Sequence, residues 1–493
     1  MPAMLQPAAG IVPPLPAVSP DPGSFRDRSN RVYDNGSRIL RGIDAAALAN
    51  WSALEAAPFF RKLVDDGKVI PTTLAPSSAA PHVAQRDGWA AMLSHERVPF
   101  VSYPYEWPFG MLKDAALLQL EVIERALEAG WTLKDASAFN VQWKDGKPVF
   151  IDICSFEPRK PGEPWSGYRQ FCMMFLFPLM IRGYRGVDHI PLLRSNLEGI
   201  DPALARQLLS GMATFRRGVL GHVHLQARMQ KSAQAAELAE AARLTEAAGG
   251  EVRKAAGVRH SDAMVLGLVQ SLARLVRRLE PKGSGTTWQD YAATHSYADD
   301  SLDRKKRFVA RHAGARHRRL VFDLGCNAGL FSQIAADHAD LVVAMDGDAN
   351  AIERLFRQER ARDRSGILPL VMDLSNPSPG QGWRGRERRP IEARGRPDLT
   401  ICLALIHHLV ISANIPLAEV IDWLADMGGE LIIEFVSLDD AMSRLLLRNK
   451  ANQYGDYTRA EFEQLCTRRY AIAASEDVKG GTRTLYHMKP RGG

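Results

Sequence analysis

A short glycine loop with a carboxylate just before it is the part of this sequence that most directly indicates chemistry. The loop runs from Gly325 to Gly329 and follows an apolar segment that ends near Asp323. Glycines between a strand and a helix let the backbone approach a ligand closely, and the first turn of the helix offers unpaired N–H groups. A carboxylate at Asp323 would repel a pyrophosphate, which is the usual ligand of such loops, and would attract a cationic amino-acid end.

Two further acids follow at the ends of the next two expected strands. Asp346 ends the second strand, where an acid can accept hydrogen bonds from both hydroxyls of a ribose. Asp373 ends the third strand, where its side chain could bind an adenine amino group, and we expect Leu374 beside it to line the same site. An amine-binding loop, a ribose acid and an adenine acid together fit S-adenosylmethionine.

The elements that must position these residues alternate between strands and helices after Gly314. Expected strands cover 319–323, 341–346, 367–372, 399–403 and 431–435, and expected helices cover 330–338, 349–359, 416–425 and 459–466. Short, almost wholly apolar strands between helices indicate a parallel sheet that is covered on both faces. The predicted fold class of this half is α/β, a doubly wound Rossmann-like domain that ends in an antiparallel hairpin at 470–473 and 482–488.

Four segments of this half resemble class I S-adenosylmethionine-dependent methyltransferases, over about 284–493. Residues 321–329 resemble their first motif, acid-x-Gly-x-Gly-x-Gly, with Asn327 in place of the middle glycine. Residues 398–409 resemble their fourth-strand motif, and 456–462 with 483–486 resemble their closing segments. The resemblance implies the following cofactor contacts: Asp323, Gly325, Asn327 and Gly329 at the methionine end, Asp346 at the ribose, and Asp373 with Leu374 at the adenine.

A base for the methyl acceptor would have to lie beside the cofactor's methyl group. His407 and His408 come just after the fourth expected strand, and the near-neutral pKa of imidazole suits removal of a proton from an oxygen or carbon acceptor. The alternative is that the two histidines pack and position their loop. Glu434, at the end of the fifth strand, is a weaker candidate, and Asp348 is expected to cap the helix that follows it.

A second set of polar residues lies in the first half of the chain. Asp135, Asn140 and Asp152 surround a β-hairpin that we expect over 140–153. They resemble the catalytic loop and metal-binding acid of protein-kinase-like phosphotransferases, which implies Asp135 as the base and Asn140 with Asp152 as ligands of Mg-ATP. The sequence lacks a glycine-rich phosphate loop and has Cys154 where a glycine is usual. A hairpin flanked by turn-stabilising Asp and Asn is therefore the alternative.

Composition and turn signals divide the chain into four parts. We expect a disordered Pro- and Ala-rich arm at 1–29, an α+β domain of kinase-like type at 30–230, a helical linker at 231–261 and the methyltransferase domain at 262–493. Other expected elements are a hairpin turning at Asn35-Gly36 and helices over 111–129, 203–257 and 261–278.

Composition excludes several classes of protein. With 46% apolar and 24% charged residues in 493, the chain is neither collagen-like, wholly disordered nor membrane-spanning. Its five cysteines include no two at metal-ligand spacing, so no metal site is expected. The early residues carry no Lys or Arg, which favours a cytoplasmic location over secretion. The charge of +7 is a small excess, and we interpret basic clusters such as 304–307 as solvated surface without a nucleic-acid partner.

Residues 30–490 as a whole resemble a bacterial family of two-part methyltransferases related to nodulation-associated methyltransferase-like proteins. We therefore expect an S-adenosylmethionine-dependent methyltransferase with a small-molecule acceptor and no membrane partner. The sequence identifies neither the acceptor nor an oligomeric state. The aromatic block 103–109 is expected in the core, with an acceptor pocket as the alternative. Two other functions stay open: an ATP-dependent phosphotransferase or ATP-binding regulatory module in the first half, and a non-catalytic sensor.

Overall fold

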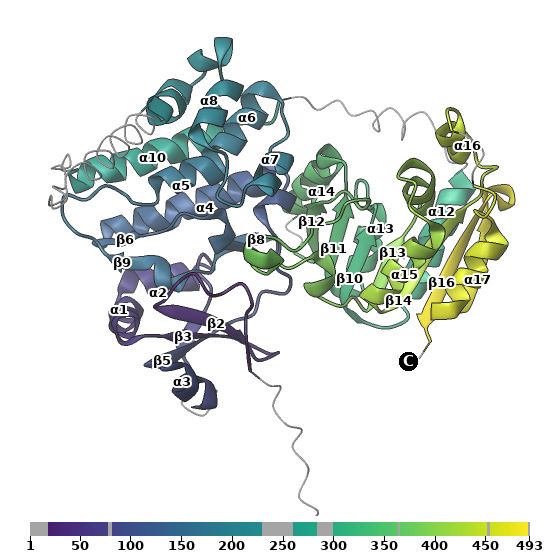
Figure 1. The fold of residues 1–493 in the computed structure, drawn as a ribbon, viewed down its shortest axis with the longest axis horizontal. Coiled ribbons are helices and arrows are strands. Elements are labelled where there is room, and N and C mark those ends of the chain that lie inside the picture. The colour runs from purple at the N-terminus through teal and green to yellow at the C-terminus, as the bar shows by residue number, and fades with distance from the viewer. Residues whose placement is uncertain are drawn as a thin grey trace, which may run out of the picture. The chain divides into compact units, whose positions relative to one another are not determined.

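The computed structural model describes residues 18–76, 81–228, 260–282, 299–362, 365–450 and 454–491. Backbone contacts divide the chain into a unit that ends at Arg97 and a unit that begins at Val98 (Figure 1). The division therefore does not fall at the linker predicted for 231–261, most of which lies outside the described residues. Residues on both sides of that stretch belong to the second unit, because α10 (Asp262–Arg278) and α14 (Ala349–Ala361) both pack against α4 (Phe109–Glu128).

The first unit is built on an antiparallel sheet with the strand order β1-β2-β3-β5-β4. Its elements are β1 (Ser19–Pro20), β2 (Asn30–Asp34), β3 (Ile39–Ile43), α1 (Ala45–Ala56), α2 (Pro58–Asp65), β4 (Thr72–Leu74), α3 (Pro81–Asp87) and β5 (Ala91–His95). The β2–β3 hairpin turns at Asn35-Gly36 as predicted, with Gly36 at φ +83°. Residues 18–29 do not belong to a disordered arm, because the Asp21 N–H donates to the Val32 carbonyl and β1 pairs with β2. The rest of the predicted arm lies outside the described residues.

The second unit begins with a helical part around α4 (Phe109–Glu128), which matches the predicted helix and is followed at once by the turn at Gly130, φ +78°. Its other elements are β6 (Trp131–Leu133), β7 (Val141–Lys144), β8 (Lys147–Phe150), β9 (Phe156–Pro158), α5 (Tyr168–Phe171), α6 (Phe177–Arg185), α7 (Ile190–Ser195), α8 (Pro202–Leu208) and α10 (Asp262–Arg278). The prediction of one helix over 203–257 is wrong in its described part. The helix stops after α8, where Gly211 and Gly218 adopt positive φ, and the remainder from 229 lies outside the described residues.

The aromatic block 103–109 lies in the core of this helical part. Tyr103, Tyr105, Trp107 and Phe109 are all buried. The prediction of core packing is therefore confirmed for these side chains, since large aromatic surfaces contribute most when they are removed from water.

The rest of the second unit is a seven-stranded sheet with the order β12-β11-β10-β13-β14-β16-β15 (Figure 1). Its strands are β10 (Arg318–Leu324), β11 (Ala339–Asp346), β12 (Ile367–Val371), β13 (Leu399–Cys402), β14 (Glu430–Val436), β15 (Tyr470–Val478) and β16 (Arg483–Pro490). Its helices are α12 (Asp299–Ala313), α13 (Leu330–Ala336), α14 (Ala349–Ala361), α15 (Leu417–Met427), α16 (Ala441–Leu447) and α17 (Arg459–Arg469). β10 to β14 are parallel, and β16 pairs antiparallel with β14 and β15. This strand order confirms the predicted α/β, doubly wound fold of this half.

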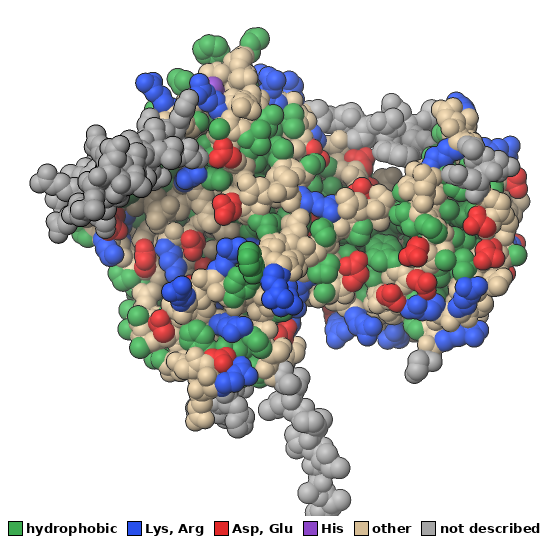
Figure 2. Space-filling view, in the orientation of Figure 1, with side chains coloured by type: hydrophobic (Ala, Val, Ile, Leu, Met, Phe, Trp, Pro, Cys, Tyr) green, Lys and Arg blue, Asp and Glu red, His purple; other side chains and the backbone are tan. Residues whose placement is uncertain are grey.

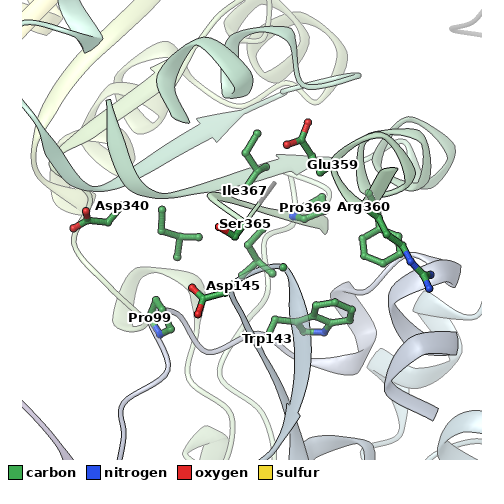
Figure 3. Close-up of a pocket in the computed structure, with 13 residues that line it drawn as sticks. Pro99, Trp143, Asp145, Asp340, Glu359, Arg360, Ser365, Ile367 and Pro369 are labelled. Atoms are coloured by element: carbon green, nitrogen blue, oxygen red, sulfur yellow. The ribbon is translucent and has the colours of Figure 1, made fainter. Parts of the chain in front are cut away.

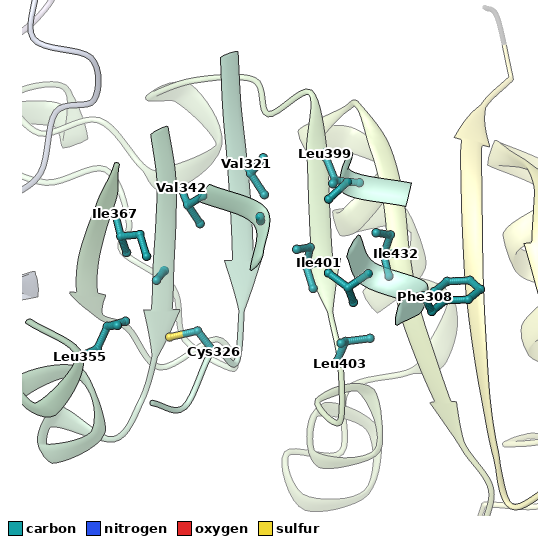
Figure 4. Close-up of a cluster of buried hydrophobic side chains, with 14 of the residues drawn as sticks. Phe308, Val321, Cys326, Val342, Leu355, Ile367, Leu399, Ile401, Leu403 and Ile432 are labelled. Carbon is teal, nitrogen blue, oxygen red and sulfur yellow. The ribbon is translucent and has the colours of Figure 1, made fainter. Parts of the chain in front are cut away.

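A continuous apolar core fixes this sheet. Figure 4 shows the strand side chains of that core, which include Val321, Val342, Ile367, Leu399, Ile401 and Ile432. Leu355 of α14 and Phe308 of α12 join them from the helices. Every residue of β12 and β13 is buried, because helices cover both faces of the parallel strands. Each such side chain contributes about 1.5–3 kcal/mol relative to an exposed one, so the strand ends are held rigidly.

Candidate functional site

The carboxyl ends of the parallel strands meet at one edge of the sheet. The register pairs Leu324 with Cys402 across β10 and β13, and Asp346 with Val371 across β11 and β12. The chain runs outward from β10 to β12 and then returns to β13, so the strand order reverses between β10 and β13. Open α/β sheets bind ligands in the crevice at such a reversal, outside the carboxyl ends of the strands.

The predicted glycine loop lies at this reversal, between β10 and α13. Gly325, Asn327 and Gly329 have φ values of +75°, +49° and +82°, so the loop needs residues that tolerate the left-handed region. A Cβ at position 329 would stand 2.4 Å from Leu355 Cδ1, so a glycine there also lets α14 pack closely. Asn327 is among the side chains that adopt this conformation most readily, which explains how it replaces a glycine.

Asp323, the acid before the loop, is buried within β10 and is 2% exposed. Its Oδ2 accepts a hydrogen bond of 2.6 Å from the hydroxyl of Ser332 on α13. The pKa of Asp323 is raised to about 7, chiefly by burial and also by the nearby Asp346 carboxylate, against the opposing effect of the Ser332 hydrogen bond. The structure thus holds a carboxyl group beneath the glycine loop whose charge changes near neutral pH.

Asp346, at the end of β11, joins the glycine loop to the next turn. Its Oδ2 accepts from the Asn327 N–H at 2.8 Å, and its Oδ1 accepts from the Asp348 N–H at 2.8 Å. Burial raises the pKa of Asp346 above its ordinary value. Asp348 caps α14 as predicted, because its side chain accepts from the N–H groups of Asn350 and Ala351.

Asp373 lies just beyond β12, beside the end of β11. The Met372 N–H donates to the Asp346 carbonyl at 2.8 Å, so the two strand ends are adjacent. The Asp373 side chain is exposed and accepts from both the N–H and the hydroxyl of Ser375, whereas Leu374 is buried. The structure therefore brings all of the predicted cofactor residues to one edge of the sheet.

The loop after β13 faces the glycine loop. A Cβ at Gly325 would stand 3.4 Å from Leu405 Cβ. Ala404 takes a φ of +51°, and its N–H donates to Glu434 Oε2 at 2.9 Å. Glu434 is fully buried, and its Oε1 lies 2.6 Å from the ammonium of Lys305. Glu434 therefore holds this loop rather than projecting toward an acceptor, and we correct its prediction as a base on that ground.

His407 and His408 lie at the start of a π-helical turn after the same loop, with ring centroids 4.3 Å apart. His407 is 1% exposed, and its Nδ1 has no hydrogen-bond partner among the described residues. Burial lowers the pKa of His407 to about 2, and burial also lowers the pKa of the half-buried His408. Both rings are therefore neutral near pH 7, and His407 is packed in the way that the alternative interpretation expects.

A curated protein resembles almost the full length of the chain. The nodulation protein NoeA of Rhizobium meliloti (strain 1021) is 34% identical over 477 residues, which cover 96% of this chain and 97% of that protein. The chain belongs to the NoeA family. No family model matches its sequence.

Solved structures match a smaller share of this NoeA-family chain. The PH0226 protein of Pyrococcus horikoshii OT3 is 18% identical and covers 42% of the chain and 100% of its own length, with a TM-score of 0.31. The N-methyltransferase NodS of Bradyrhizobium japonicum WM9, solved in complex with S-adenosyl-L-homocysteine, is 15% identical with the same coverage and a TM-score of 0.30.

Two residues of the site were missed by sequence reasoning. Ser332 supplies the hydroxyl that Asp323 accepts, and Lys305 pairs with Glu434. Lys305 falls in the basic cluster that we interpreted as solvated surface, yet it is 2% exposed. Its spacing from the buried Phe308 and Val309 of α12, three and four residues along, is the signal that places it on the buried face of the helix.

The second predicted set comes together around two short hairpin-like pairs in the helical part. β7 and β8 form the predicted hairpin, with Asp145 and Gly146 at positive φ in its turn, and β6 pairs with β9. Asn140 Nδ2 lies 3.3 Å from Asp152 Oδ2, and the Asp135 N–H donates to Ser155 Oγ at 3.1 Å. Within the described residues, no group of three or more His, Cys, Asp or Glu side chains could hold a metal ion.

A small cavity lies at the other edge of the sheet from the glycine loop (Figure 3). Its volume is about 50 Å³, and it lies between Trp143 and Asp145 of the β7–β8 hairpin and the first residues of β11 and β12, such as Asp340 and Ile367. It is far smaller than the ligand pockets of about 300–1,000 Å³ that bind drug-sized molecules. The cavity is therefore a packing gap within the second unit and not the cofactor site.

Proposed function

We propose that this chain transfers a methyl group from S-adenosylmethionine to a small-molecule acceptor in the cytoplasm, with the cofactor bound at the carboxyl edge of the parallel sheet. The observation that carries the proposal is the position of Asp323, Asp346 and Asp373 at the ends of three adjacent strands, beside a glycine loop at the strand-order reversal. A glycine loop alone would suit many nucleotides. Three acids in this order suit a ligand with a cationic amino-acid end, a ribose and an adenine.

Each part of the site has a role in this proposal. The glycine loop and Asp323 hold the methionine end, Asp346 binds the ribose hydroxyls, and Asp373 with Leu374 contacts the adenine. Because Gly325 has no side chain, there is space between this loop and Leu405. A larger residue at position 325 would fill that space. The cofactor supplies a methyl group on a positively charged sulfur, and the protein's task is to bind it and to orient the acceptor in line with it.

We propose that His408, rather than His407, takes the acceptor proton. His408 is half-buried, so a ligand can reach it, whereas the ring of His407 is enclosed. A lowered pKa keeps His408 neutral at pH 7 and therefore able to accept a proton. His407 would then position the loop, which keeps both predicted histidines in the site.

The first test is calorimetric titration of the full chain with S-adenosylhomocysteine. Asp346→Asn should weaken binding by about 10- to 150-fold, because a charge-assisted hydrogen bond contributes about 1.5–3 kcal/mol. Asp340→Asn is the matched control, since Asp340 is an exposed acid near the start of the same strand and should leave affinity unchanged. Equal affinity of wild type and Asp346→Asn, with unchanged melting, would overturn the proposed ribose site.

The acceptor class is tested separately with radiolabelled S-adenosylmethionine. The full chain is incubated with the small-molecule and the macromolecular fractions of a bacterial extract. Label in the small-molecule fraction supports the proposal, and label that enters only protein or nucleic acid contradicts it. His408→Ala should reduce this transfer while it leaves affinity for S-adenosylhomocysteine unchanged.

A second candidate is binding of Mg-ATP by Asp135, Asn140 and Asp152. What supports it is the 3.3 Å approach of the Asn140 amide to the Asp152 carboxylate at the ends of a hairpin. In that contact the amide nitrogen donates to the carboxylate, and the oxygen of the same amide together with the carboxylate would be the protein ligands of magnesium, which takes its other ligands from phosphates and water. Titration with Mg-ATP should show binding that Asp152→Ala abolishes. Asp145→Asn in the hairpin turn is the control, since Asn also tolerates the left-handed turn. If the wild type does not bind Mg-ATP, this candidate function is wrong.

A further inference from the structure

Large apolar side chains project into solvent from one surface of the helical part. Met212 and Phe215 are 89% and 90% exposed, and Leu204, Leu220 and Leu225 are also exposed. Leu204 belongs to α8, Met212 and Phe215 to a 3-10 turn at Gly211–Phe215, and Leu220 to a π-helical turn at Leu220–His224, which Leu225 directly follows. These elements pack against one another. We call residues 202–228 the apolar tip. Figure 2 shows hydrophobic side chains at the top of the view, above α8, with Lys and Arg side chains on both sides of them.

The apolar tip is held in place by its other side. Ala213, Val219 and Val223 are buried, and they alternate in sequence with the exposed residues. Gly218 adopts φ +81°, and a Cβ there would stand 2.5 Å from Leu275 of α10, so the turn is pressed against the helical core. Met212 and Phe215 therefore project from a packed base, and the exposed surface is a defined one.

The charge of the apolar tip has a single sign. Residues 202–228 contain four arginines, Arg206, Arg216, Arg217 and Arg228, and no Asp or Glu. All four arginines are exposed, and Arg206, Arg216 and Arg217 form no ion pair within the described residues. The rest of the chain mixes both signs, with 63 basic and 56 acidic residues overall. Exposed apolar residues bordered by unpaired arginines are complementary to a surface that is apolar inside and anionic outside.

We propose that the apolar tip binds the surface of an anionic lipid bilayer. Met212, Phe215 and Leu220 insert at the boundary between headgroups and acyl chains, and the arginines contact lipid phosphates. A projecting apolar surface suits a bilayer, which can deform around it, better than a protein partner that would need a matching pocket. Nucleic acid is disfavoured because its apolar contacts are stacked bases, and only one of the five exposed apolar residues is aromatic.

This inference departs from the expectation of no membrane partner. It concerns attachment to a surface, since within the described residues no helix has the length and apolar character to span a bilayer. It is also independent of the methyltransferase proposal, because the apolar tip contains none of the residues of the cofactor site.

The test is co-flotation of the full chain with vesicles of phosphatidylcholine alone and of phosphatidylcholine with phosphatidylglycerol. We expect binding to the anionic vesicles only, and weaker binding as salt is raised. Met212→Ser with Phe215→Ser should reduce the bound fraction by at least about tenfold, since the apolar contribution scales with the inserted area. Arg216→Gln and Arg217→Gln should each weaken binding about fivefold.

The matched control is Met264→Ser with Leu445→Ser, which removes two apolar residues exposed elsewhere in the same unit. This control should bind vesicles as the wild type does, and S-adenosylhomocysteine affinity should be the same in every variant. No flotation of the wild type, or flotation that the Met212 and Phe215 substitutions leave unchanged, would overturn the proposal. Retention of RNA with equal affinity in place of vesicles would overturn it as well.

Discussion

Asp323 is the acid of the cofactor site whose protonation depends most on the fold. Its carboxyl group is enclosed beneath the glycine loop, where burial raises its pKa to about 7. Below that pH the group is protonated and neutral, and above it the group carries a negative charge. A ligand with a cationic amino-acid end favours the charged form, so its binding should release a proton near neutral pH.

Affinity for S-adenosylhomocysteine should therefore rise with pH. Between pH 6 and 7.5 we expect an increase of up to about eightfold, which is the ratio of ionised fractions for a pKa of about 7. Calorimetry in buffers of different ionisation enthalpy measures the proton release directly. Asp323→Asn should bind more weakly and lose the pH dependence. A wild-type affinity that is flat over this range would show that Asp323 does not face the ammonium group.

At the scale of elements, the site depends on an ion pair between a helix and a strand. Lys305 of α12 meets Glu434 of β14, and Glu434 in turn accepts the N–H of Ala404 in the loop that faces the glycine loop. Both side chains are almost fully buried, and Arg483 Nη1 lies 3.5 Å from the same carboxylate. Removal of one partner of a buried pair leaves a charge that water cannot reach.

Lys305→Met should consequently lower the free energy of unfolding by up to about 3–5 kcal/mol, with the lower values if Arg483 compensates. Lys306→Met is the matched control, because Lys306 is more exposed and, within the described part of the chain, pairs only with Asp303; it should change stability by less than about 1 kcal/mol. Urea unfolding of both variants measures the difference. The double variant with Glu434→Gln should recover part of the loss, and a strictly additive loss would contradict the pairing.

Strands and glycines of this site could be predicted from the sequence because their signals are local. Apolar runs and the spacing of Asp323, Gly325 and Gly329 indicate the first strand, loop and helix directly. The basic neighbours of Lys305 indicated solvated surface, and although its spacing from Phe308 and Val309 places it on the buried face of α12, its partner Glu434 on β14 is brought near only by the fold. The prediction of one helix over 203–257 was wrong for a related reason: Ala- and Leu-rich composition favours a helix, whereas Gly211 and Gly218 adopt positive φ, and the turn at Gly218 packs closely against Leu275 of α10.

At the scale of the whole second unit, the segment that follows Asp373 is fastened to the helical part. Arg394 donates to both oxygens of Glu106, at 2.7 and 2.6 Å, and both side chains are buried. Arg194 of α7 donates to the carbonyls of Asn376 and Pro377. The adenine side of the proposed cofactor site is thus positioned by residues of the preceding half of the unit.

Glu106→Gln should therefore lower stability by about 3–5 kcal/mol and also weaken S-adenosylhomocysteine binding, although Glu106 touches no part of the cofactor site. Arg360→Gln is the control, because the Arg360–Asp114 pair joins the same two parts with an arginine that is 62% exposed. It should affect both quantities only slightly. Melting temperature and calorimetric affinity are measured on the same samples. Lower stability with unchanged affinity would show that the segment after Asp373 does not depend on this contact.

The contact between Glu106 and Arg394 also bears on how the protein is made. The two residues are separated by 288 positions in the chain. A ribosome that adds about 5–20 residues per second takes roughly 15–60 s to cover that distance. During this interval Glu106 of the nascent helical part lies in a position that is buried in the finished fold, and its partner Arg394 has not yet been synthesised. We expect the helical part to stay accessible to chaperones until the sheet has been translated. Folding of the helical part is therefore completed only after the second half of the chain has been made.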